Sequence, residues 1–393
     1  MATIKVKNLS KIFGPHARKE AAGLLRQGVS KAEILERTGC TVAINDASFE
    51  VQEGEIFVVM GLSGSGKSTV LRCLNRLIEP TTGEVFIDDE NVMKMDRQHL
   101  RLVRRRKTAM VFQHFGLLPH RDVLSNTWYG LELQGVEEEE RRKKAYDALE
   151  LVGLKGYETS MTQQLSGGMQ QRVGLARALA TDPGILLMDE AFSALDPLIR
   201  TQMQDELLDL QDQMHKSIVF ITHDLDEALK LGDRIAIMKD GAIVQIGTPE
   251  QILTEPADDY VRAFVENVDR SKVITAGTVM EKARAIDLSR GGPHYAVREM
   301  RKWDCSALYV TDHNRVLQGR VQLDDALRLA KANNRDLTEV INEDVVTATP
   351  DTPLAELLQV ASETTSIAVV DDRNRLVGVV TRPLLLTGIS GED

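Results

Sequence analysis

The sequence predicts an α/β fold that carries a phosphate-binding site, followed by a second region of α+β type. The first part rests on residues 61–68, Gly-Leu-Ser-Gly-Ser-Gly-Lys-Ser, which lie between an apolar run at 56–60 and a helical pattern at 69–74. The second part rests on a repeated helix–strand–turn–strand pattern beyond about residue 275. A chain of 393 residues is also too long for one hydrophobic core, so two or three domains are expected.

The phosphate loop, residues 61–68, matches the pattern G-x-x-x-x-G-K-[ST] at Gly61, Gly66, Lys67 and Ser68. Its glycines allow backbone N–H groups to wrap around phosphate oxygens at a helix N-terminus. Lys67 adds a positive charge near the β- and γ-phosphates, and the Ser68 hydroxyl is a hard oxygen ligand suited to Mg²⁺. The flanking strand and helix favour this interpretation over a glycine-rich turn without a ligand.

A second buried strand is predicted at 185–188, and it ends in two acidic residues. Acidic side chains at the end of an apolar strand are costly unless they serve a cation or a reaction. Asp189 is suited to Mg²⁺, directly or through water, and Glu190 is suited to polarising the attacking water in phosphoryl transfer. For either acid alone, a solvated strand end would be the default interpretation.

Four further short runs follow a fixed order along the chain: Val111-Phe112-Gln113, Leu165-Ser166-Gly167-Gly168-Met169-Gln170-Gln171, Ser193-Ala194-Leu195-Asp196 and Ile221-Thr222-His223-Asp224. In this order, they resemble the Q-loop, signature sequence, D-loop and switch histidine of the ATP-binding subunits of ABC transporters. The phosphate loop and the acidic strand are two further motifs of the same family. The resemblance covers about residues 3–265. It implies a P-loop NTPase fold with a RecA-like core, an antiparallel β subdomain and a helical subdomain.

The resemblance also implies the roles of individual residues. Glu190, His223 and Gln113 form the catalytic set, and Gln113 also senses the γ-phosphate. Mg²⁺ is held by Ser68, Gln113 and Asp189. The residues expected to bind ATP are Phe13, Gly61, Ser63, Gly64, Gly66, Lys67, Ser68, Thr69, Ser166, Gly167, Gly168 and Asp196.

The signature residues are expected to act across a homodimer. Ser166, Gly167 and Gly168 should open a helix whose N-terminus faces the γ-phosphate bound to the partner subunit, and such a helix start is a good anion site. Asp196 should contact the opposite phosphate loop. Closure of the dimer on ATP would then drive integral membrane permease subunits, to which a substrate-binding protein delivers the solute.

Phe13 occupies the position at which the family places the ring that stacks on adenine. Packing of this ring in the core is the alternative. An extra stretch at about 15–41 separates Phe13 from the phosphate loop, and its apolar spacing fits two short helices. This insertion is either a tolerated surface element or a docking or regulatory element, and both interpretations stay open.

Composition narrows the class of protein. A net charge of −11 argues against a general nucleic-acid binder, and the three cysteines form neither a metal nor a redox pattern. The first residues read as a strand rather than a signal peptide, and no stretch has the apolar length that spans a bilayer. We expect a peripheral protein at the cytoplasmic face of the cell membrane, with another protein forming the pore.

The repeat beyond residue 275 resembles a tandem pair of CBS domains. Its second copy is the better match, with a helix at 354–358 and strands at 367–370 and 376–380, whereas the first copy is divergent. The resulting domain prediction is an ATPase domain at 1–270, a divergent CBS domain at 276–335 and a CBS domain at 340–393.

Each copy departs from the pattern Gly-x-x-Thr/Ser-x-x-Asp that nucleotide-binding CBS pairs often carry. In the second copy Leu384 replaces the acid, and in the first copy Gln322 replaces the hydroxyl residue. Three interpretations therefore stay open for this pair: a scaffold for dimerisation, a sensor of ionic strength or of the membrane surface, and a site for another nucleotide.

The combination of cassette, insertion and CBS pair resembles the ATPase subunit of glycine betaine/proline betaine importers. This resemblance implies ATP hydrolysis that energises the import of a quaternary-amine osmoprotectant, under osmotic or ligand control by the CBS pair. The alternatives are the ATPase subunit of an importer for another solute, such as methionine, and a soluble ABC ATPase outside transport. The chain has one cassette and no heptad run, which disfavours the soluble class.

Overall fold

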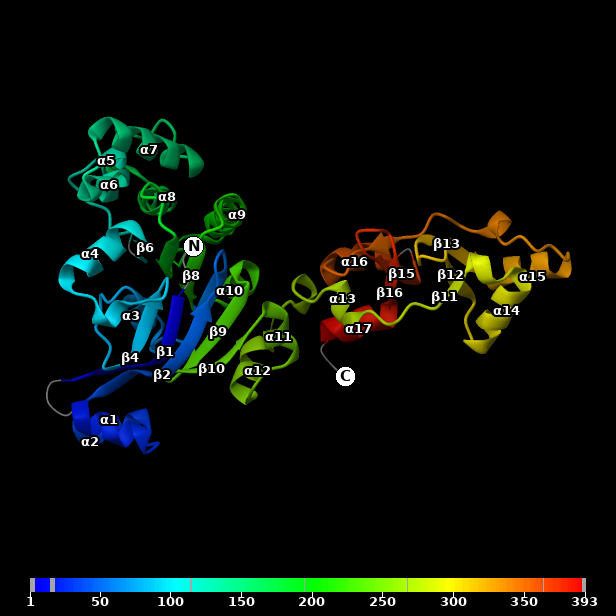
Figure 1. The fold of residues 1–393 in the computed structure, drawn as a ribbon, viewed down its shortest axis with the longest axis horizontal. Coiled ribbons are helices and arrows are strands. Elements are labelled where there is room, and N and C mark those ends of the chain that lie inside the picture. The colour runs from blue at the N-terminus through cyan, green and yellow to red at the C-terminus, as the bar shows by residue number, and fades with distance from the viewer. Residues whose placement is uncertain are drawn as a thin grey trace. The chain divides into compact units, whose positions relative to one another are not determined.

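The computed structural model describes residues 4–14, 18–113, 115–193, 195–266, 268–362 and 364–390. The chain divides into two compact units, Met1–Glu266 and Asn267–Asp393 (Figure 1). The domain borders predicted from the sequence stay predictions.

A six-stranded sheet forms the centre of the first unit, in the order β10-β9-β3-β8-β7-β6. Five neighbouring strands are parallel, and β10 pairs antiparallel with β9. Every residue of β3, β7 and β8 is buried, as expected for parallel strands that are covered on both faces. The strands are β3 Ile56–Met60, β6 Thr108–Val111, β7 Ile185–Asp189, β8 Ser217–Thr222, β9 Arg234–Lys239 and β10 Ala242–Gly247.

A four-stranded antiparallel sheet packs against the same core, in the order β2-β1-β4-β5. Phe49 of this sheet stacks on Phe57 of the central sheet with ring centroids 5.0 Å apart, so the two sheets share one hydrophobic cluster. Its strands are β1 Ile4–Phe13, β2 Thr41–Val51, β4 Thr82–Ile87 and β5 Glu90–Asn91.

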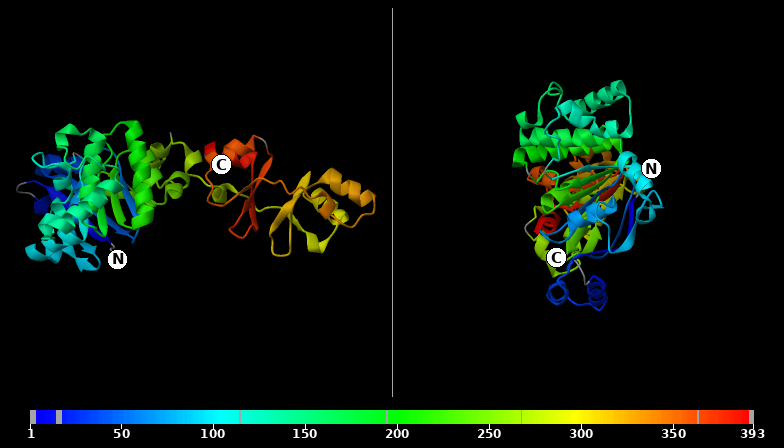
Figure 2. Two further views of the ribbon diagram at one scale, coloured as in Figure 1. Left: turned by 90° about the horizontal axis from the view of Figure 1, so that it is seen from above. Right: turned by 90° about the vertical axis from the view of Figure 1, so that its left-hand side faces the viewer.

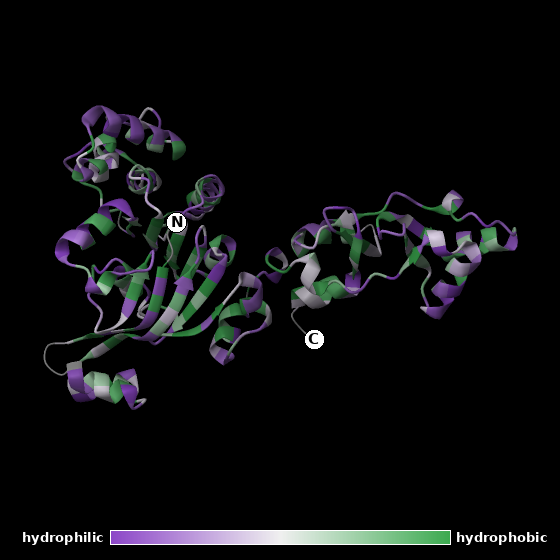
Figure 3. Cartoon of the chain, in the orientation of Figure 1, coloured by the Kyte–Doolittle hydropathy of each residue, from purple (hydrophilic) through white to green (hydrophobic). Residues whose placement is uncertain are grey.

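Helices cover the central sheet and build a separate helical subdomain from α5 to α8. Apolar residues gather on the central strands, whereas α7 is largely hydrophilic, as its charged sequence predicts (Figure 3). The helices are α3 Lys67–Leu74, α4 Arg97–Arg106, α5 Val123–Thr127, α6 Tyr129–Gln134, α7 Glu138–Leu151, α8 Gly167–Leu179, α9 Pro197–Met214, α10 Leu225–Leu231, α11 Pro249–Thr254 and α12 Asp259–Val265.

The insertion after Phe13 folds into the two short helices that the sequence predicts, α1 Arg18–Arg26 and α2 Lys31–Thr38. The two helices pair with each other beside the ends of β1 and β2 (Figure 2). A small apolar cluster holds them there and includes Leu24, Ile34 and Cys40. Residues 15–17 of the insertion lie outside the described part of the chain.

The second unit contains two three-stranded sheets of the same topology, β11-β12-β13 and β14-β15-β16. In each sheet the first pair of strands is parallel and the second pair is antiparallel. The divergent first copy therefore has the strand arrangement of the second. The elements are α13 Ala276–Val279, β11 Ala285–Asp287, α14 Pro293–Lys302, β12 Ala307–Thr311, β13 Leu317–Gln322, α15 Leu323–Lys331, β14 Thr347–Ala348, α16 Leu354–Ala361, β15 Ser366–Val370, β16 Leu376–Thr381 and α17 Arg382–Ser390.

Candidate functional site

The phosphate loop connects the end of β3 to the start of α3 and leaves no room for a side chain at two of its glycines. Gly61 and Gly66 have φ angles of 149° and 103°. A Cβ at Gly61 would lie 2.2 Å from the carbonyl oxygen of Met238, and one at Gly66 would lie 2.2 Å from that of Ala43. Both positions therefore require glycine, and the turn they form leaves loop N–H groups available to an anion.

Lys67 begins α3 and is only 5% exposed. Its Nζ donates to the carbonyl oxygens of Gly61, at 2.7 Å, and Leu62, at 3.1 Å. Burial lowers the pKa of this ammonium, while Glu190 and Asp189 act in the opposite direction. A buried cation whose hydrogen-bond partners are neutral carbonyls is poised to gain an anionic partner, and a triphosphate fits that need.

The rest of the loop offers hydroxyl groups to the same ligand. Ser68 and Thr69 lie in the first turn of α3 and are half-buried, whereas Ser63 and Gly64 are exposed at the tip of the loop. The buried Ser65 Oγ has no hydrogen-bond partner among the described residues. These donors fit a phosphate group.

Asp189 ends β7 and is 2% exposed. One carboxylate oxygen, Oδ2, lies 3.2 Å from a guanidinium nitrogen of Arg72, whereas Oδ1 has no hydrogen-bond partner within the described part of the chain. A buried carboxylate oxygen without a donor is costly. A hydrated Mg²⁺ would satisfy it, so the residues present fit the ion expected here.

Glu190 brings the three predicted catalytic residues together. Its Oε2 accepts from Gln113 Nε2 at 3.0 Å and lies 3.3 Å from His223 Nδ1. The Glu190 backbone has a φ of 45°, and its N–H donates to the carbonyl of Ile221 on β8. The neighbouring strand thus holds Glu190 in a left-handed backbone conformation that is uncommon for a residue other than glycine.

The signature residues form the start of α8. Ser166 caps the helix by accepting from the Met169 N–H at 3.3 Å, and Ser166 and Gly167 are exposed. A Cβ at Gly168 would lie 2.8 Å from Ile199 of α9, so close helix packing requires that glycine. The first N–H groups of a helix lack intrahelical partners, so this exposed start can receive an anion.

Asp196 and Phe13 both lie at the surface. Asp196 caps α9 by accepting from the Ile199 N–H at 3.1 Å, and its neighbour Ala194 lies outside the described residues. Phe13 is 39% exposed, with Lys11 Nζ 4.8 Å from its ring centroid. This exposure favours a ring available for stacking over a ring packed in the core.

Two further residues, Arg72 and Ser193, make contacts in the site that the sequence did not predict. Arg72 pairs with Asp189, and Ser193 Oγ lies 3.4 Å from Gln113 Nε2 while donating to the Glu190 carbonyl at 2.9 Å. Ser193 belongs to the D-loop run, so its position was visible although its contacts were not. Arg72 carried no signal, because an arginine on a helix usually faces solvent.

The second unit uses its glycines differently from the phosphate loop. A Cβ at Gly378 would lie 2.4 Å from Met280 Sδ, and one at Gly319 would lie 2.4 Å from Ile341 Cγ2. Side chains of the chain itself therefore fill the space beside both glycines of the incomplete nucleotide pattern. Packing accounts for these glycines without a bound adenosine.

The fold and the phosphate site define an ABC-type ATPase cassette. Residues 44–193 match the family model described as ABC transporter, and residues 337–390 match the model described as CBS domain. Two solved structures of the cassette MJ0796 superpose with TM-scores of 0.54, and each covers 63% of this chain and 98% of that chain. One is a dimeric bacterial ABC transporter cassette at 34% identity, and the other is a dimer bound to ADP and Pi at 33%.

Curated relatives identify the family. The chain is 54% identical to the glycine betaine transport ATP-binding protein OpuAA of Bacillus subtilis, over 99% of this chain and 93% of that protein. It is 53% identical to the glycine betaine/carnitine transport ATP-binding protein GbuA of Listeria monocytogenes, over 100% of this chain and 99% of that protein. It is 49% identical to the glycine betaine/proline betaine transport system ATP-binding protein ProV of Escherichia coli, over 99% of this chain and 98% of that protein. The chain belongs to the family of glycine betaine/proline betaine ABC transporter ATP-binding subunits.

This membership confirms the predicted fold class and the predicted activity, ATP hydrolysis coupled to transport. It does not favour the alternatives of a methionine importer subunit or a soluble ATPase outside transport. The roles assigned to individual site residues stay predictions.

Proposed function

We propose that two copies of this chain bind two Mg·ATP and energise the import of glycine betaine or a related quaternary amine. The observation that carries the catalytic part is the convergence of Gln113 and His223 on one carboxylate oxygen of Glu190. The solute is inferred from the transport systems named for the relatives, glycine betaine in each case and also carnitine or proline betaine in some.

Residues of the chain divide the work of hydrolysis. Glu190 orients and polarises the attacking water, and His223 holds the γ-phosphate and this water in line. Gln113 reports the γ-phosphate to the rest of the subunit. Ser68, Gln113 and Asp189 would hold Mg²⁺, which when bound neutralises charge on the β- and γ-phosphates. Asp189 Oδ1, to which no group in the described ranges donates a hydrogen bond, supports that assignment.

The proposed active form is a head-to-tail homodimer. The exposed start of α8, with Ser166, Gly167 and Gly168, would complete the γ-phosphate site of the partner subunit. Asp196, exposed at the start of α9, would meet the partner's phosphate loop. The dimeric state of the related cassette MJ0796 supports this arrangement.

The proposed permease docks in a groove beside the Q-loop. Three exposed apolar side chains, Leu77, Phe112 and Leu133, line this groove together with Arg177. Apolar surface of this kind marks an interaction site. No helix in the described ranges is long and apolar enough to cross a membrane. We propose that the chain is a peripheral protein at the cytoplasmic face of the membrane. Its direct partner there is the permease, and a substrate-binding protein acts with it indirectly.

The second unit is proposed to regulate the cycle as a tandem CBS pair. Its two copies share one topology, and Tyr309 OH of the first lies 2.8 Å from Ser366 Oγ of the second. We propose domains at 1–270, 276–335 and 340–393, with osmotic or ligand control through the pair.

Reconstitution tests the transport proposal. The chain is purified with the membrane protein that accompanies it, inserted into vesicles, and supplied with substrate-binding protein and candidate solutes. Glycine betaine should raise ATP hydrolysis, and methionine serves as the matched control. Stimulation by methionine alone, or purification without any membrane protein, would contradict the proposal.

A truncation tests the regulatory part. Residues 1–266 should retain basal ATPase activity but should respond differently to salt when combined with the permease. An identical salt response in the truncated and full-length chains would remove the sensor role.

A further inference from the structure

We propose that Arg177 is a positioning residue that ties α8 to the post-Gln113 segment, defined as residues 115–122. The proposal deepens the proposed function and rests on it, because α8 carries the signature residues and Gln113 contacts Glu190. It assigns to one side chain the coupling between two parts of the catalytic machinery within a single subunit.

The Arg177 guanidinium donates hydrogen bonds to two consecutive backbone carbonyl groups. One guanidinium nitrogen donates to the Gly116 carbonyl at 2.6 Å, and the other donates to the Phe115 carbonyl at 2.9 Å. Phe115 and Gly116 have φ angles of 55° and 57°, so the chain makes a left-handed turn where the arginine holds it. A left-handed phenylalanine persists only where its surroundings impose it, and the planar guanidinium fork provides that constraint.

The charge of Arg177 has no carboxylate partner in the described part of the chain. Its hydrogen bonds go to backbone carbonyls, and burial lowers the pKa of the guanidinium. Arg177 is half-buried, and a partly desolvated cation without a counter-ion is costly, so the two carbonyl bonds compensate for the lost hydration. Holding this turn is the function that justifies a charged residue at this position.

Phe115 extends the connection along α8. A Cβ at Gly167, the first residue of the helix, would lie 4.0 Å from Phe115 Cζ, and one at Gly174 would lie 3.6 Å from the Phe115 oxygen. Phe115 therefore lies along the helix from the signature residues to Arg177. Two residues earlier, Gln113 bonds to Glu190.

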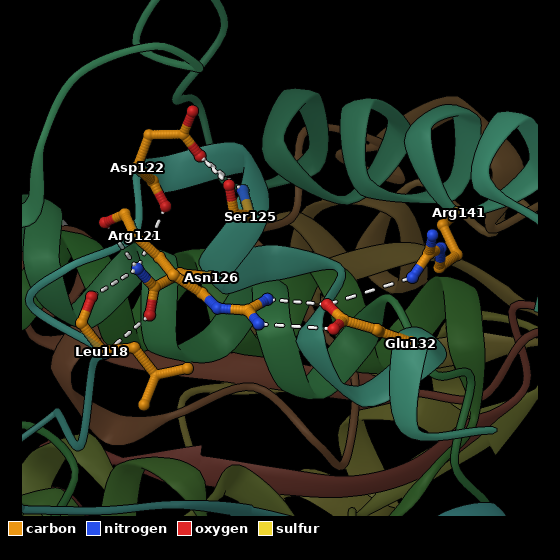
Figure 4. A network of polar contacts seen from close by, with 7 residues as sticks. All are labelled: Leu118, Arg121, Asp122, Ser125, Asn126, Glu132 and Arg141. Atoms are coloured by element: carbon orange, nitrogen blue, oxygen red, sulfur yellow. Dashed lines mark hydrogen bonds and ion pairs between the residues drawn. The ribbon is translucent and has the colours of Figure 1, made fainter. Parts of the chain in front are cut away.

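The far end of the post-Gln113 segment is fixed as well (Figure 4). The fully buried Asn126 accepts from the Leu118 N–H at 2.7 Å and donates to the carbonyls of Leu118, Arg121 and Asp122. Arg121 in turn pairs with Glu132 at 2.6 Å. Both ends of the segment are thus bonded to helices of the helical subdomain. A displacement of α8 therefore moves the start of this segment, which lies two residues after Gln113.

A double-mutant cycle in the full-length chain tests the proposal. Arg177→Gln should lower kcat by ~10-fold or more, because small misplacements of catalytic groups have effects of this size. The KM for ATP should change much less. Once Gln113→Ala is present, Arg177→Gln should have little further effect on kcat, since both changes act through the same contact.

Arg172→Gln is the matched control. Arg172 lies on the same helix, donates to the Val152 carbonyl at 3.2 Å and pairs with Glu206 at 2.8 Å. Its effect should add to that of Gln113→Ala, because it loosens α8 without touching the post-Gln113 segment. Additive effects for Arg177→Gln would overturn the proposal.

Hydrogen exchange gives a second readout that needs no ATPase activity. Amides of the post-Gln113 segment should exchange faster in Arg177→Gln than in wild type or Arg172→Gln, and unchanged exchange would overturn the proposal. If Arg177→Gln does not fold, Arg177→Lys keeps the charge, loses the fork and takes its place in both measurements. A wild-type chain without ATPase activity would count against the proposed function, whereas the exchange result still decides the role of Arg177.

Discussion

The tip of the phosphate loop and the end of β7 in the first unit differ from the incomplete nucleotide pattern of the second unit in how their glycines and buried polar atoms are surrounded. Among the described residues of the first unit, none would lie within 4 Å of a Cβ at Gly64, and none bonds to the buried Ser65 Oγ and Asp189 Oδ1. In the second unit, Met280 fills the space beside Gly378, and Tyr309 OH pairs with Ser366 Oγ.

The difference separates a ligand site from a packed scaffold. An unsatisfied buried polar atom costs about 1–3 kcal/mol, so it persists where a ligand compensates for it during function. The phosphate loop and Asp189 meet this description, whereas the glycines of the repeat unit are explained by internal packing. Four substitutions test whether this contrast holds.

The largest effect is expected from Glu190→Gln. The amide keeps the shape of the side chain but cannot act as a base, so turnover should fall by about 10²–10⁴-fold while ATP binding persists. Steady-state hydrolysis and equilibrium binding of ATP measure the two quantities. Glu53→Gln, at an exposed position, is the control, and unchanged turnover in Glu190→Gln would refute the base assignment.

Arg72→Ala should have the next largest effect. Without the guanidinium, the buried Asp189 carboxylate loses its partner at 3.2 Å and its orientation, so the Mg²⁺ concentration for half-maximal ATP binding should rise ~10-fold. ATP binding in EDTA should stay near the wild-type level. Arg262→Ala removes an exposed arginine paired with Asp259 and serves as the control. Tighter Mg²⁺ binding would show that Arg72 competes with the ion instead of orienting its ligand.

Gly378→Ala tests whether the space beside Gly378 in the second unit is filled by Met280. The new methyl group would lie 2.4 Å from Met280 Sδ, and such overpacking destabilises a fold by about 1–3 kcal/mol. Thermal unfolding should show the loss in the second unit, and Met280→Ala in the same chain should recover part of it. Gly23→Ala in α1, whose new methyl group would have no described residue within 4 Å, should not destabilise the fold. An unaffected Gly378→Ala chain would indicate open space beside Gly378 and reopen the nucleotide interpretation.

The smallest effect concerns the turn between β15 and β16. Hydrogen bonds from the Arg375 side chain and from backbone N–H groups lower the pKa of Asp371 from 3.8 to about 2. A lowered pKa in the folded state means that the ionised form stabilises the fold above pH 3.8, and this contribution is lost as the pH falls through about 2. Asp371→Asn should therefore lower the Tm slightly at pH 7, and the difference from wild type should shrink on acidification. A difference that is constant with pH would contradict the ionic origin.

Much of the fold could be predicted because its signals are local. The phosphate loop, the acidic end of β7 and the helices of the insertion each depend on residues within a few positions of one another. The repeat topology followed from the same kind of pattern, even in the divergent first copy. Local spacing is sufficient for these elements because helices and strands impose fixed periods on the apolar residues.

The contacts of Arg72 and Arg177 could not be predicted in this way. Arg72 meets an acid 117 positions away, and Arg177 binds backbone carbonyls 61 and 62 positions away. A backbone carbonyl is present at every residue, so no complementary partner to Arg177 appears in the sequence. The same holds for Met280, whose packing against Gly378 depends on how two copies of a repeat meet.

The sequence by itself determined the chemical groups of this ATPase, their order along the chain and the family to which they belong. Only the tertiary structure decided that Gln113 and His223 share one oxygen of Glu190, and that the second oxygen of Asp189 has no hydrogen-bond partner in the part of the chain that the structure describes. The physical reason is that hydrogen bonds and close packing act over a few ångströms in space. Their partners are selected by the folded backbone, whatever their separation in sequence.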